Sequence, residues 1–317
     1  MKNHLIIALT LSMFTFSCSE EDQPCEKKVW YADLDNDGKG DKNNTYETCT
    51  QPVGFVGNAD DDNDKPQEGP IIPSTGISSP LTYDGMNLIW SDEFEGTSLD
   101  ETKWNYELGN NNGWGNNELE NYTKENTSIK EGNLIITAKR QTLAGFNYTS
   151  SRLTTQNKFD FKYGRIDIRA VLPKGQGIWP AFWLLGKNIN QVSWPKCGEI
   201  DIMEMVGGSG KDNTVHGTCH WDNAGSYAQY GGSTTSASVL NSEYHLYSIV
   251  WTEKEIIWYL DNVKYHVIDI TPAGLDEFQK EFFLIFNCAV GGNWPGSPDG
   301  STVFPQHLVV DYIRVFQ

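Results

Sequence analysis

Three carboxylates lie close together in the stretch CGEIDIMEM, residues 197–205: Glu199, Asp201 and Glu204. Successive side chains of a β-strand point to opposite faces of the sheet, so Glu199 and Asp201 share a face and a regular strand would turn Glu204 away. A bulge of one extra residue, most simply around Met203, would return Glu204 to the face of the other two. The spacing therefore predicts a bulged strand with three acids on one face.

Crowded carboxylates of this kind suit the cleavage of a glycosidic bond. One must be ionised to attack the anomeric carbon and another must hold a proton for the leaving oxygen, and repulsion and burial separate their pKa values. Two carboxyl groups about 5–5.5 Å apart are typical of retention through a covalent intermediate, and residues on one strand face lie close together. The alternative is a solvated acidic strand. Ile200 and Ile202 alternate with the acids, which indicates a buried opposite face and favours a cleft.

The elements that must position these acids are predicted to be β-strands. Gly, Asn and Pro turns separate them, and no stretch from residue 88 onward has a convincing helical period. We therefore expect an all-β fold, a β-sandwich of the jelly-roll type. The runs rich in β-branched and aromatic residues are 133–140, 163–173, 199–206, 245–252, 255–262 and 307–316.

Charge and composition limit the partners. The 317 residues carry 24 Lys and Arg against 42 Asp and Glu, a formal net charge of −18. Nucleic acid and anionic membrane surfaces would repel such a chain, so neither is an expected partner. Aromatic residues make up 12% of the chain, and many tryptophans lie beside Gly, Pro or Asn, which suggests a stacking surface for a neutral ligand.

The first residues are typical of an export signal. Residues 1–18 have a basic start, an apolar run and a small residue before Cys18, a candidate lipid anchor of the lipoprotein type. Cleavage without lipidation is the alternative. The apolar run is short for a membrane span and no later segment is long and apolar enough, so no transmembrane helix is expected. The expected location is secreted, or on the outer membrane or surface of a Gram-negative bacterium.

An acidic segment, 19–64, precedes a linker rich in Pro, Gly and Ser, 65–85. Cys25 and Cys49 can pair around the acidic segment. Three further cysteines remain, Cys197, Cys219 and Cys288, and three cannot all pair within one chain. At least one buried thiol is therefore expected beyond the linker.

Four aspartates of the acidic segment alternate in the manner of calcium ligands. They are Asp33, Asp35, Asp37 and Asp41. Asn44 stands where an EF-hand has its bidentate Glu, so the segment more closely resembles the short, cysteine-bracketed calcium modules of the thrombospondin type 3 kind. A solvated acidic spacer is the alternative.

The stretch GEIDIMEMVG resembles the bulged signature of glycoside hydrolase family 16, and motifs over residues 86–317 match its laminarinase-like members in the family's order. This resemblance implies a concanavalin-like β-sandwich with a concave substrate cleft. The matching motifs are LIWSDEFEGTSLDETKWNYELGN (88–110), WGNNELENYT (114–123), GNLIITAKR (132–140), YTSSRLTTQNKFDFKYGRIDIRAVLPKGQGIWPAFWLLG (148–186), AVGGNWPG (289–296) and VVDYIRVFQ (309–317).

The resemblance also implies roles for individual residues. Glu199 would be the nucleophile, Glu204 the acid/base, and Asp201 the carboxylate that tunes and orients the pair. No cofactor would be needed for catalysis. A structural Ca²⁺ on the convex face would be held by Glu93, by the backbone carbonyl of Gly132 and by Asp311.

Sugar-binding residues are expected in the cleft motifs. Trp179, Trp194 and Trp294 lie beside prolines at strand ends or loops and would stack on sugar rings, with a core position as the alternative for each; Trp183, with Phe182, is expected in the core. Asn117 and Arg165 would meet sugar hydroxyls, although Arg165 could instead neutralise acids across the sheet. His220 would lie beside the substrate or the carboxylates. With His216 it makes only a weak metal site, because a third ligand is missing from the motif.

The function that the resemblance implies is a retaining endo-β-1,3-glucanase, a laminarinase, acting on β-1,3-glucan polysaccharide, with mixed-linkage β-1,3-1,4-glucans as a second substrate, as a monomer. Another β-glycan, such as lichenan or a marine galactan, is an alternative substrate, although an acidic chain is a poor host for sulfated galactans. A non-catalytic glucan-binding lectin on the same fold is an alternative function. The residues do not rank water against sugar as the acceptor, so transglycosylation stays open.

Overall fold

The computed structural model describes residues 25–33, 39–52, 55–61, 69–237 and 240–317. The predicted export signal with Cys18, and the aspartates Asp35 and Asp37, lie outside the described residues. The chain divides into two compact units at residues 66 and 67.

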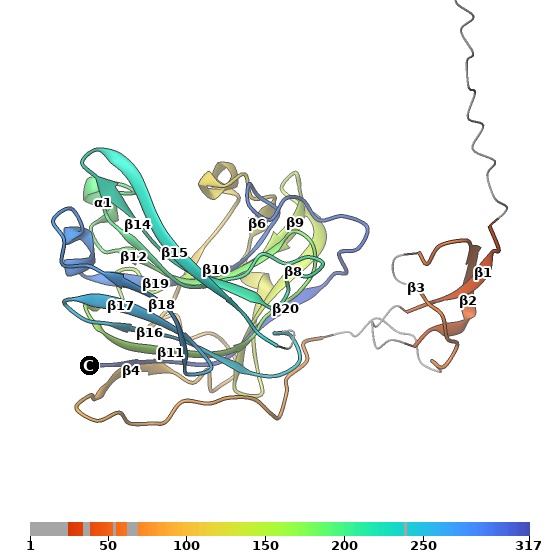
Figure 1. Ribbon diagram of the computed structural model, residues 1–317, viewed down its shortest axis with the longest axis horizontal. Helices are drawn as coiled ribbons and strands as arrows, with labels where there is room; N and C mark the ends of the chain where they lie inside the picture. The colour runs from red at the N-terminus through yellow and green to blue at the C-terminus, as the bar shows by residue number, and fades with distance from the viewer. Residues whose placement is uncertain (1–24, 34–38, 53–54, 62–68, 238–239) are drawn as a thin grey trace, which may run out of the picture. The chain divides into compact units, whose positions relative to one another are not determined.

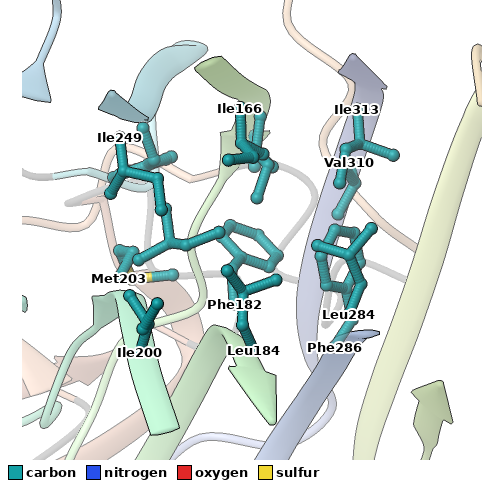
Figure 2. Packing of buried hydrophobic residues seen from close by; sticks show 14 of the residues in the cluster. Ile166, Phe182, Leu184, Ile200, Met203, Ile249, Leu284, Phe286, Val310 and Ile313 are labelled. Atoms are coloured by element: carbon teal, nitrogen blue, oxygen red, sulfur yellow. The ribbon is translucent and has the colours of Figure 1, made fainter. Parts of the chain in front are cut away.

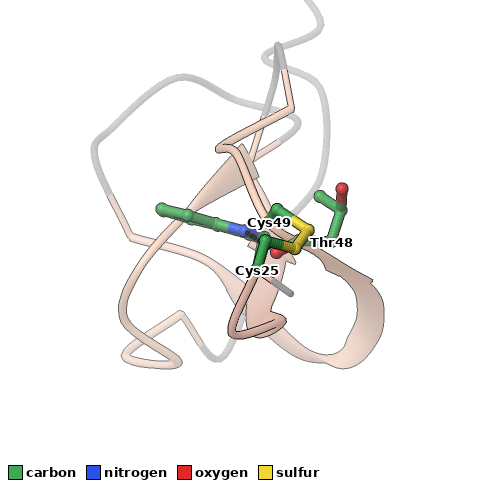
Figure 3. The surroundings of a disulfide bond; sticks show 4 residues. Cys25, Thr48 and Cys49 are labelled. Carbon is green, nitrogen blue, oxygen red and sulfur yellow. Dashed lines mark hydrogen bonds between the residues drawn. A yellow bond between two sulfur atoms is a disulfide. The ribbon is translucent and has the colours of Figure 1, made fainter. Parts of the chain in front are cut away.

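The N-terminal unit contains a three-stranded antiparallel sheet. Its order is β2 (Asp41–Thr48), β1 (Lys28–Ala32) and β3 (Phe55–Val56). A disulfide joins Cys25 to Cys49 beside Thr48 (Figure 3). The carbonyl oxygen of Thr48 accepts a hydrogen bond from the indole N–H of Trp30 at 3.1 Å. The predicted pairing of these cysteines is confirmed. Calcium binding at Asp33 and Asp41 stays a prediction; Asp41 accepts hydrogen bonds from the backbone and side chain of Asn43.

The second unit is a sandwich of two curved sheets, which lie one over the other in Figure 1. The seven-stranded sheet has the order β15 (Ser226–Thr235), β14 (Thr214–Asn223), β13 (Glu199–Glu204), β12 (Ile178–Gly186), β19 (Phe282–Val290), β10 (Arg152–Thr154) and β5 (Asn105–Glu107).

The ten-stranded sheet covers the other side of the core. Its order is β18 (Val263–Asp269), β17 (Glu255–Leu260), β16 (His245–Trp251), β11 (Gly164–Val171), β20 (Gln306–Phe316), β8 (Asn133–Leu143), β9 (Phe146–Ser150) and β6 (Glu120–Tyr122), with β4 (Leu88–Asp92) beside β20 and β7 (Thr127–Lys130) beside β8.

Helix is scarce in the described part of the chain. It comprises one α-helical turn, α1 (Ile189–Val192), and the 3₁₀ segments η1 (Asn111–Gly115), η2 (Lys124–Asn126) and η3 (Asp276–Gln279). No helix among the described residues is long and apolar enough to cross a membrane. The predicted all-β fold is confirmed.

The hydrophobic core lies between the two sheets because alternate residues of each strand point inward. In Figure 2, Ile166 of β11 and Ile249 of β16 face Phe182 of β12 and Met203 of β13 across the sandwich. Burial of such side chains contributes about 1.5–3 kcal/mol each. The outer face of each sheet does not take part in the core. The outer face of the seven-stranded sheet carries the site described below.

Part of the expected linker is attached to the outer face of the ten-stranded sheet. The backbone N–H of Ile77 donates to the carbonyl oxygen of Tyr244 at 2.9 Å, and that of Ser79 to the Tyr312 hydroxyl at 2.6 Å. Farther along, the Tyr83 hydroxyl donates to Asp167 Oδ2 at 2.6 Å. A segment rich in Pro, Gly and Ser is extended both when it is surrounded by solvent and when it is bound to a sheet. The composition of the segment therefore did not predict these contacts. We call residues 76–83 the strap.

The three remaining cysteines, Cys197, Cys219 and Cys288, are free thiols, and all of them are buried. The expectation of at least one buried thiol is therefore met by all three. Burial raises the pKa of each thiol, that of Cys197 to about 12.

Candidate active site

Strand β13 carries the predicted bulge. On the β12 side, Met203 pairs with Phe182 and Asp201 with Trp183, which leaves Ile202 as the extra residue, next to the position expected. On the β14 side the register also shifts between Asp201 and Glu204. Ile202 and Met203 both enter the core. The extra residue therefore returns Glu204 to the face of the two other acids.

A tryptophan of the ten-stranded sheet contacts the bulge from the core side. Trp258 of β17 is fully buried, and its indole N–H donates to the backbone oxygen of Asp201 at 2.7 Å. Gly217 of β14 makes room for this ring, because a Cβ there would lie 2.3 Å from a Trp258 ring carbon. The bulge is thus held by a residue that lies on the far side of the core from the cleft.

The three acids lie on the floor of an open cleft of about 890 Å³, hollowed into the outer face of the seven-stranded sheet. Residues of β10, β12, β13, β14, β15 and β19 line it, together with Trp114, Gly115, Asn116, Glu118 and Trp294. The lining residues come from six adjacent strands, each about 4.8 Å from the next, so the cleft can hold several units of an extended polymer.

Two tryptophans donate hydrogen bonds to the outer acids. The indole N–H of Trp194 donates to Glu199 Oε2 at 3.0 Å, and that of Trp179 to Glu204 Oε1 at 3.0 Å. Trp294 meets Trp179 edge to face, with ring centroids 5.7 Å apart. Trp194 and Trp294 are 47% and 44% exposed, so their rings remain available at the cleft. All three predicted tryptophans line the cleft, and two of them also orient the carboxylates.

His220 lies beside the middle acid. Its Nε2 is 2.9 Å from Asp201 Oδ2 and 3.8 Å from Glu199 Oε1. Its Nδ1 lies 2.7 Å from the Tyr227 hydroxyl, which donates to Gln229 Oε1 at 2.6 Å. The imidazole is therefore held from both sides, at the place expected for His220.

Burial raises the pKa of all three acids. The pKa of Glu199 rises to about 8, through desolvation first and the charge of Asp201 second, while His220 and the Trp194 hydrogen bond lower it. Desolvation also raises the pKa of Asp201, and a hydrogen bond with Glu199 lowers it. The pKa of Glu204 is well above its usual value, through desolvation and then the charges of Asp201 and Glu199. Glu204, whose pKa is raised by the charges of both neighbouring acids, is the one placed to keep a proton.

Comparison with known proteins identifies the family. The model of "Glycosyl hydrolases family 16" matches residues 115–313. The chain belongs to this family. It is 42% identical over 246 residues to a "Beta-glucanase" of Rhodothermus marinus, covering 73% of this chain and 85% of that protein.

Other relatives give the same assignment. The catalytic domain of an endo-1,3-beta-glucanase (laminarinase) from Thermotoga petrophila is 46% identical, with a TM-score of 0.70 over 73% of this chain and 98% of that one. A "Glucan endo-1,3-beta-glucosidase A1" of Niallia circulans is 37% identical over 273 residues, or 77% of this chain. The chain spans well under two thirds of some curated relatives, 40% in the case of the Niallia protein.

A second group of side chains lines the cleft of this family 16 domain and was missed from the sequence. The Arg152 guanidinium lies between two rings, 4.4 Å from the Trp114 centroid and 4.8 Å from that of Trp183. Its Nε is 2.5 Å from Glu107 Oε2. The expectation of Trp183 in the core was wrong. Strand alternation carried the signal, because Phe182 enters the core and its neighbour must then face the cleft.

The structure places Arg165 away from the cleft. It lies on β11 of the ten-stranded sheet, where Ile166 points into the core, so Arg165 faces the outer side. Its Nε is 2.8 Å from Asp167 Oδ1, and its guanidinium lies 4.4 Å from the Tyr83 ring centroid. The expected sugar contact is wrong for this residue. Its partner is an acid of the same strand face.

Asn117 joins two loops at the edge of the cleft. Its side-chain amide donates to Asn293 Oδ1 at 2.7 Å, beside Trp294. The neighbouring Asn116 lines the cleft, whereas Asn117 does not. Asn117 therefore positions the loop that carries Trp294.

Two of the three predicted calcium ligands of the convex face, Glu93 and Asp311, contact an arginine. Glu93 receives two hydrogen bonds from Arg314, at 2.9 and 2.7 Å, and Asp311 Oδ2 is 2.6 Å from Arg169 Nη1. Gly132 lies in the turn between β7 and β8, with a φ of +71°. Calcium at these residues stays a prediction.

Proposed function

We propose that this chain is a retaining endo-β-1,3-glucanase that hydrolyses β-1,3-glucans such as laminarin, with mixed-linkage β-1,3-1,4-glucans as a second substrate. The observation that carries the proposal is the bulged strand, which presents three acids to one open cleft. The middle acid is buried, and the two outer acids accept hydrogen bonds from tryptophans. Relatives named as beta-glucanase and laminarinase support the substrate class.

In this proposal each acid has a separate role. Glu199 attacks the anomeric carbon while Glu204 gives its proton to the leaving glycosidic oxygen, and a covalent glycosyl–enzyme forms. Glu204, now ionised, then takes a proton from water, whose oxygen attacks the same carbon and releases Glu199. Asp201 lies beside Glu199 on the same face of the strand, and its Oδ2 is 2.9 Å from His220 Nε2, so it orients the nucleophile.

The walls of the cleft fit a neutral polymer. Trp194 lies at the Glu199 end and Trp294 at the Glu204 end, and both expose ring faces on which pyranose rings can stack. The acids on the floor disfavour a sulfated chain, because its charges would be repelled in a partly desolvated groove.

Three further properties are part of the proposal and rest on the sequence. They are export with a lipid anchor at Cys18 on the surface of a Gram-negative cell, structural Ca²⁺ at the aspartates of the N-terminal unit and at the convex face, and a monomeric state. The region before Cys18 supports the lipid anchor, and the aspartate spacing supports the calcium site of the N-terminal unit.

A substrate panel tests the activity. The purified chain is incubated with laminarin, mixed-linkage glucan, agarose and carrageenan, and new reducing ends are measured. We expect laminarin to be cleaved fastest, with a rapid fall in viscosity, and the β anomer of the product to appear first in the NMR spectrum. Folded protein that binds laminarin but releases no reducing ends would instead be a lectin. First appearance of the α anomer would refute retention.

A further inference from the structure

Three side-chain atoms at the floor of the cleft form a cluster whose arrangement goes beyond acid/base chemistry. Glu199, Asp201 and His220 each offer one ligand atom, and these three atoms lie within 4.8 Å of one another. His220 Nε2 is 2.9 Å from Asp201 Oδ2 and 3.8 Å from Glu199 Oε1. Asp201 is only 3% exposed, and its Oδ2 is buried without an aligned hydrogen bond.

These atoms have the chemistry and spacing of a zinc-type site. Zn²⁺ binds imidazole nitrogen and carboxylate oxygen at about 2.0–2.2 Å, and sites with an open position use three protein ligands. Two ligands of a tetrahedral ion with such bonds are about 3.3 Å apart, and the observed 2.9 and 3.8 Å bracket that value. Ca²⁺ and Mg²⁺ prefer six or more oxygens and do not match a nitrogen-containing set of three.

The groups around the cluster also fit a metal. A histidine that binds a metal usually hydrogen-bonds through its other ring nitrogen, and ligating carboxylates are hydrogen-bonded in turn. Here His220 Nδ1 lies 2.7 Å from the Tyr227 hydroxyl, and the second oxygen of Glu199 accepts from Trp194 at 3.0 Å. The fourth position faces the open cleft, where water can complete the coordination.

We propose that Glu199, Asp201 and His220 form an inhibitory site for a divalent cation of the borderline class, Zn²⁺ or Cu²⁺. The cation binds the oxygen of Glu199 that would attack the substrate and offsets the repulsion among the crowded acids. Binding of the cation is independent of the reaction catalysed. Only its inhibitory effect rests on the proposed glucanase function.

Binding is tested first, without substrate. Co²⁺ is added to the purified full-length protein in the presence of excess Ca²⁺, which occupies oxygen-only sites, and visible absorption is recorded before and after Zn²⁺. We expect the intense bands of four-coordinate Co²⁺, lost when Zn²⁺ displaces it, and one site by calorimetry. His220→Asn should weaken binding at least tenfold.

A matched histidine serves as control. His216 lies on the same strand and lines the same cleft, but it contacts Trp294 and not the cluster. His216→Asn should therefore keep the Co²⁺ spectrum and the affinity. Equal losses in both variants, or no spectrum in the unaltered protein, would overturn the proposal. Circular dichroism checks that each variant is folded.

A second pair of variants tests the groups around the metal. Tyr227→Phe removes the hydroxyl that contacts His220 Nδ1, and this change should weaken Zn²⁺ binding about 10–100-fold. Tyr230 lies three residues farther along β15, is similarly exposed, and packs on His266, so Tyr230→Phe should leave affinity unchanged. Unaltered affinity in Tyr227→Phe would show that the hydroxyl does not support a metal-bound His220 and would contradict the proposed site.

Inhibition is measured last. Zn²⁺ should inhibit laminarin cleavage competitively and reversibly, EDTA should restore the rate, and Mg²⁺ should have no effect. Protein that binds Co²⁺ but cleaves no glucan would refute the glucanase function and leave the metal site standing. Protein that cleaves glucan, is insensitive to Zn²⁺ and shows no Co²⁺ bands would refute the metal site alone.

Discussion

The indole N–H of Trp258 donates a hydrogen bond to the backbone oxygen of Asp201 at 2.7 Å. The two residues belong to different sheets, so the strand that carries the three acids is held through the core by the sheet behind it. Because the contact is made at the bulge, it bears on the direction in which Glu204 points.

Trp258→Phe should reduce both stability and turnover. The ring remains but the donor is lost, and a buried carbonyl without a partner costs about 1–3 kcal/mol. Relaxation of the bulge should lower kcat more than it raises KM. Trp251 is a matched control, because it is equally buried and donates to the carbonyl of Phe278 at 3.1 Å, away from the acids. Urea unfolding and kinetics of Trp251→Phe should show the stability loss without the loss in kcat.

The roles of Glu199 and Glu204 can be separated with azide. Glu204→Ala should still react with an activated β-glucoside, losing about 10²–10⁴-fold on natural glucans, and azide should yield the β-glycosyl azide. Glu199→Ala should be inactive alone, and azide should then enter from the vacated side and give the α-azide. NMR of the products distinguishes the two. Reversed stereochemistry would exchange the roles.

The two tryptophan donors should act on opposite limbs of the pH profile of kcat/KM. Each indole hydrogen bond lowers the pKa of the acid that accepts it. Trp194→Phe should raise the pKa of Glu199, which must be ionised, and so move the acidic limb to higher pH. Trp179→Phe should raise the pKa of Glu204, which must be protonated, and so move the alkaline limb to higher pH. The same limb moving in both variants would contradict the assignment.

Arg165→Ala should destabilise the fold and spare catalysis. Asp167 is fully buried, so loss of its cationic partner should lower the free energy of unfolding by about 3 kcal/mol. This value is the lower end of the range for a buried ion pair, because the hydroxyls of Tyr83 and Ser248 still donate hydrogen bonds to Asp167. Chemical unfolding measures the loss. A change in kcat/KM on laminarin larger than about twofold, in conditions where the variant is folded, would return Arg165 to the substrate site.

The strap predicts a difference between two truncated chains. Residues 67–317 keep the hydrogen bonds of Ile77 and Ser79, whereas residues 81–317 lose them. Each bond contributes about 0.5–1.5 kcal/mol, so the shorter chain should unfold at lower denaturant with unaltered kcat. Equal midpoints would show that the strap contributes nothing to stability.

Much of the fold was predictable because its signals are local. All six predicted runs contain strands, for example 255–262 around β17 and 307–316 around β20. The hairpin strand β15 (SYAQYGGSTT) was missed because it lies at a sheet edge and is polar. Strand β19 (FFLIFNCAV) is buried throughout and shows no alternation.

The part of the site that lies within one strand was predictable, whereas the parts that depend on strand order or strand face were not. The bulge follows from the spacing of Glu199, Asp201 and Glu204 within one strand, so no long-range information was needed. Arg152 reaches the cleft only because β10 pairs between β19 and β5, and no local pattern encodes that order. Arg165 was predicted to contact sugar from its motif alone, and the motif does not indicate which face of β11 the side chain occupies.

The two units differ in the redox conditions under which they can fold, because one contains only free thiols and the other a disulfide. Cys197, Cys219 and Cys288 lie inside the sandwich, and their raised pKa keeps them from forming the thiolate that oxidants attack. The catalytic unit can therefore mature equally in reducing and oxidising surroundings. The Cys25–Cys49 crosslink belongs to the small N-terminal unit, so a reductant should loosen that unit and leave glucan cleavage intact.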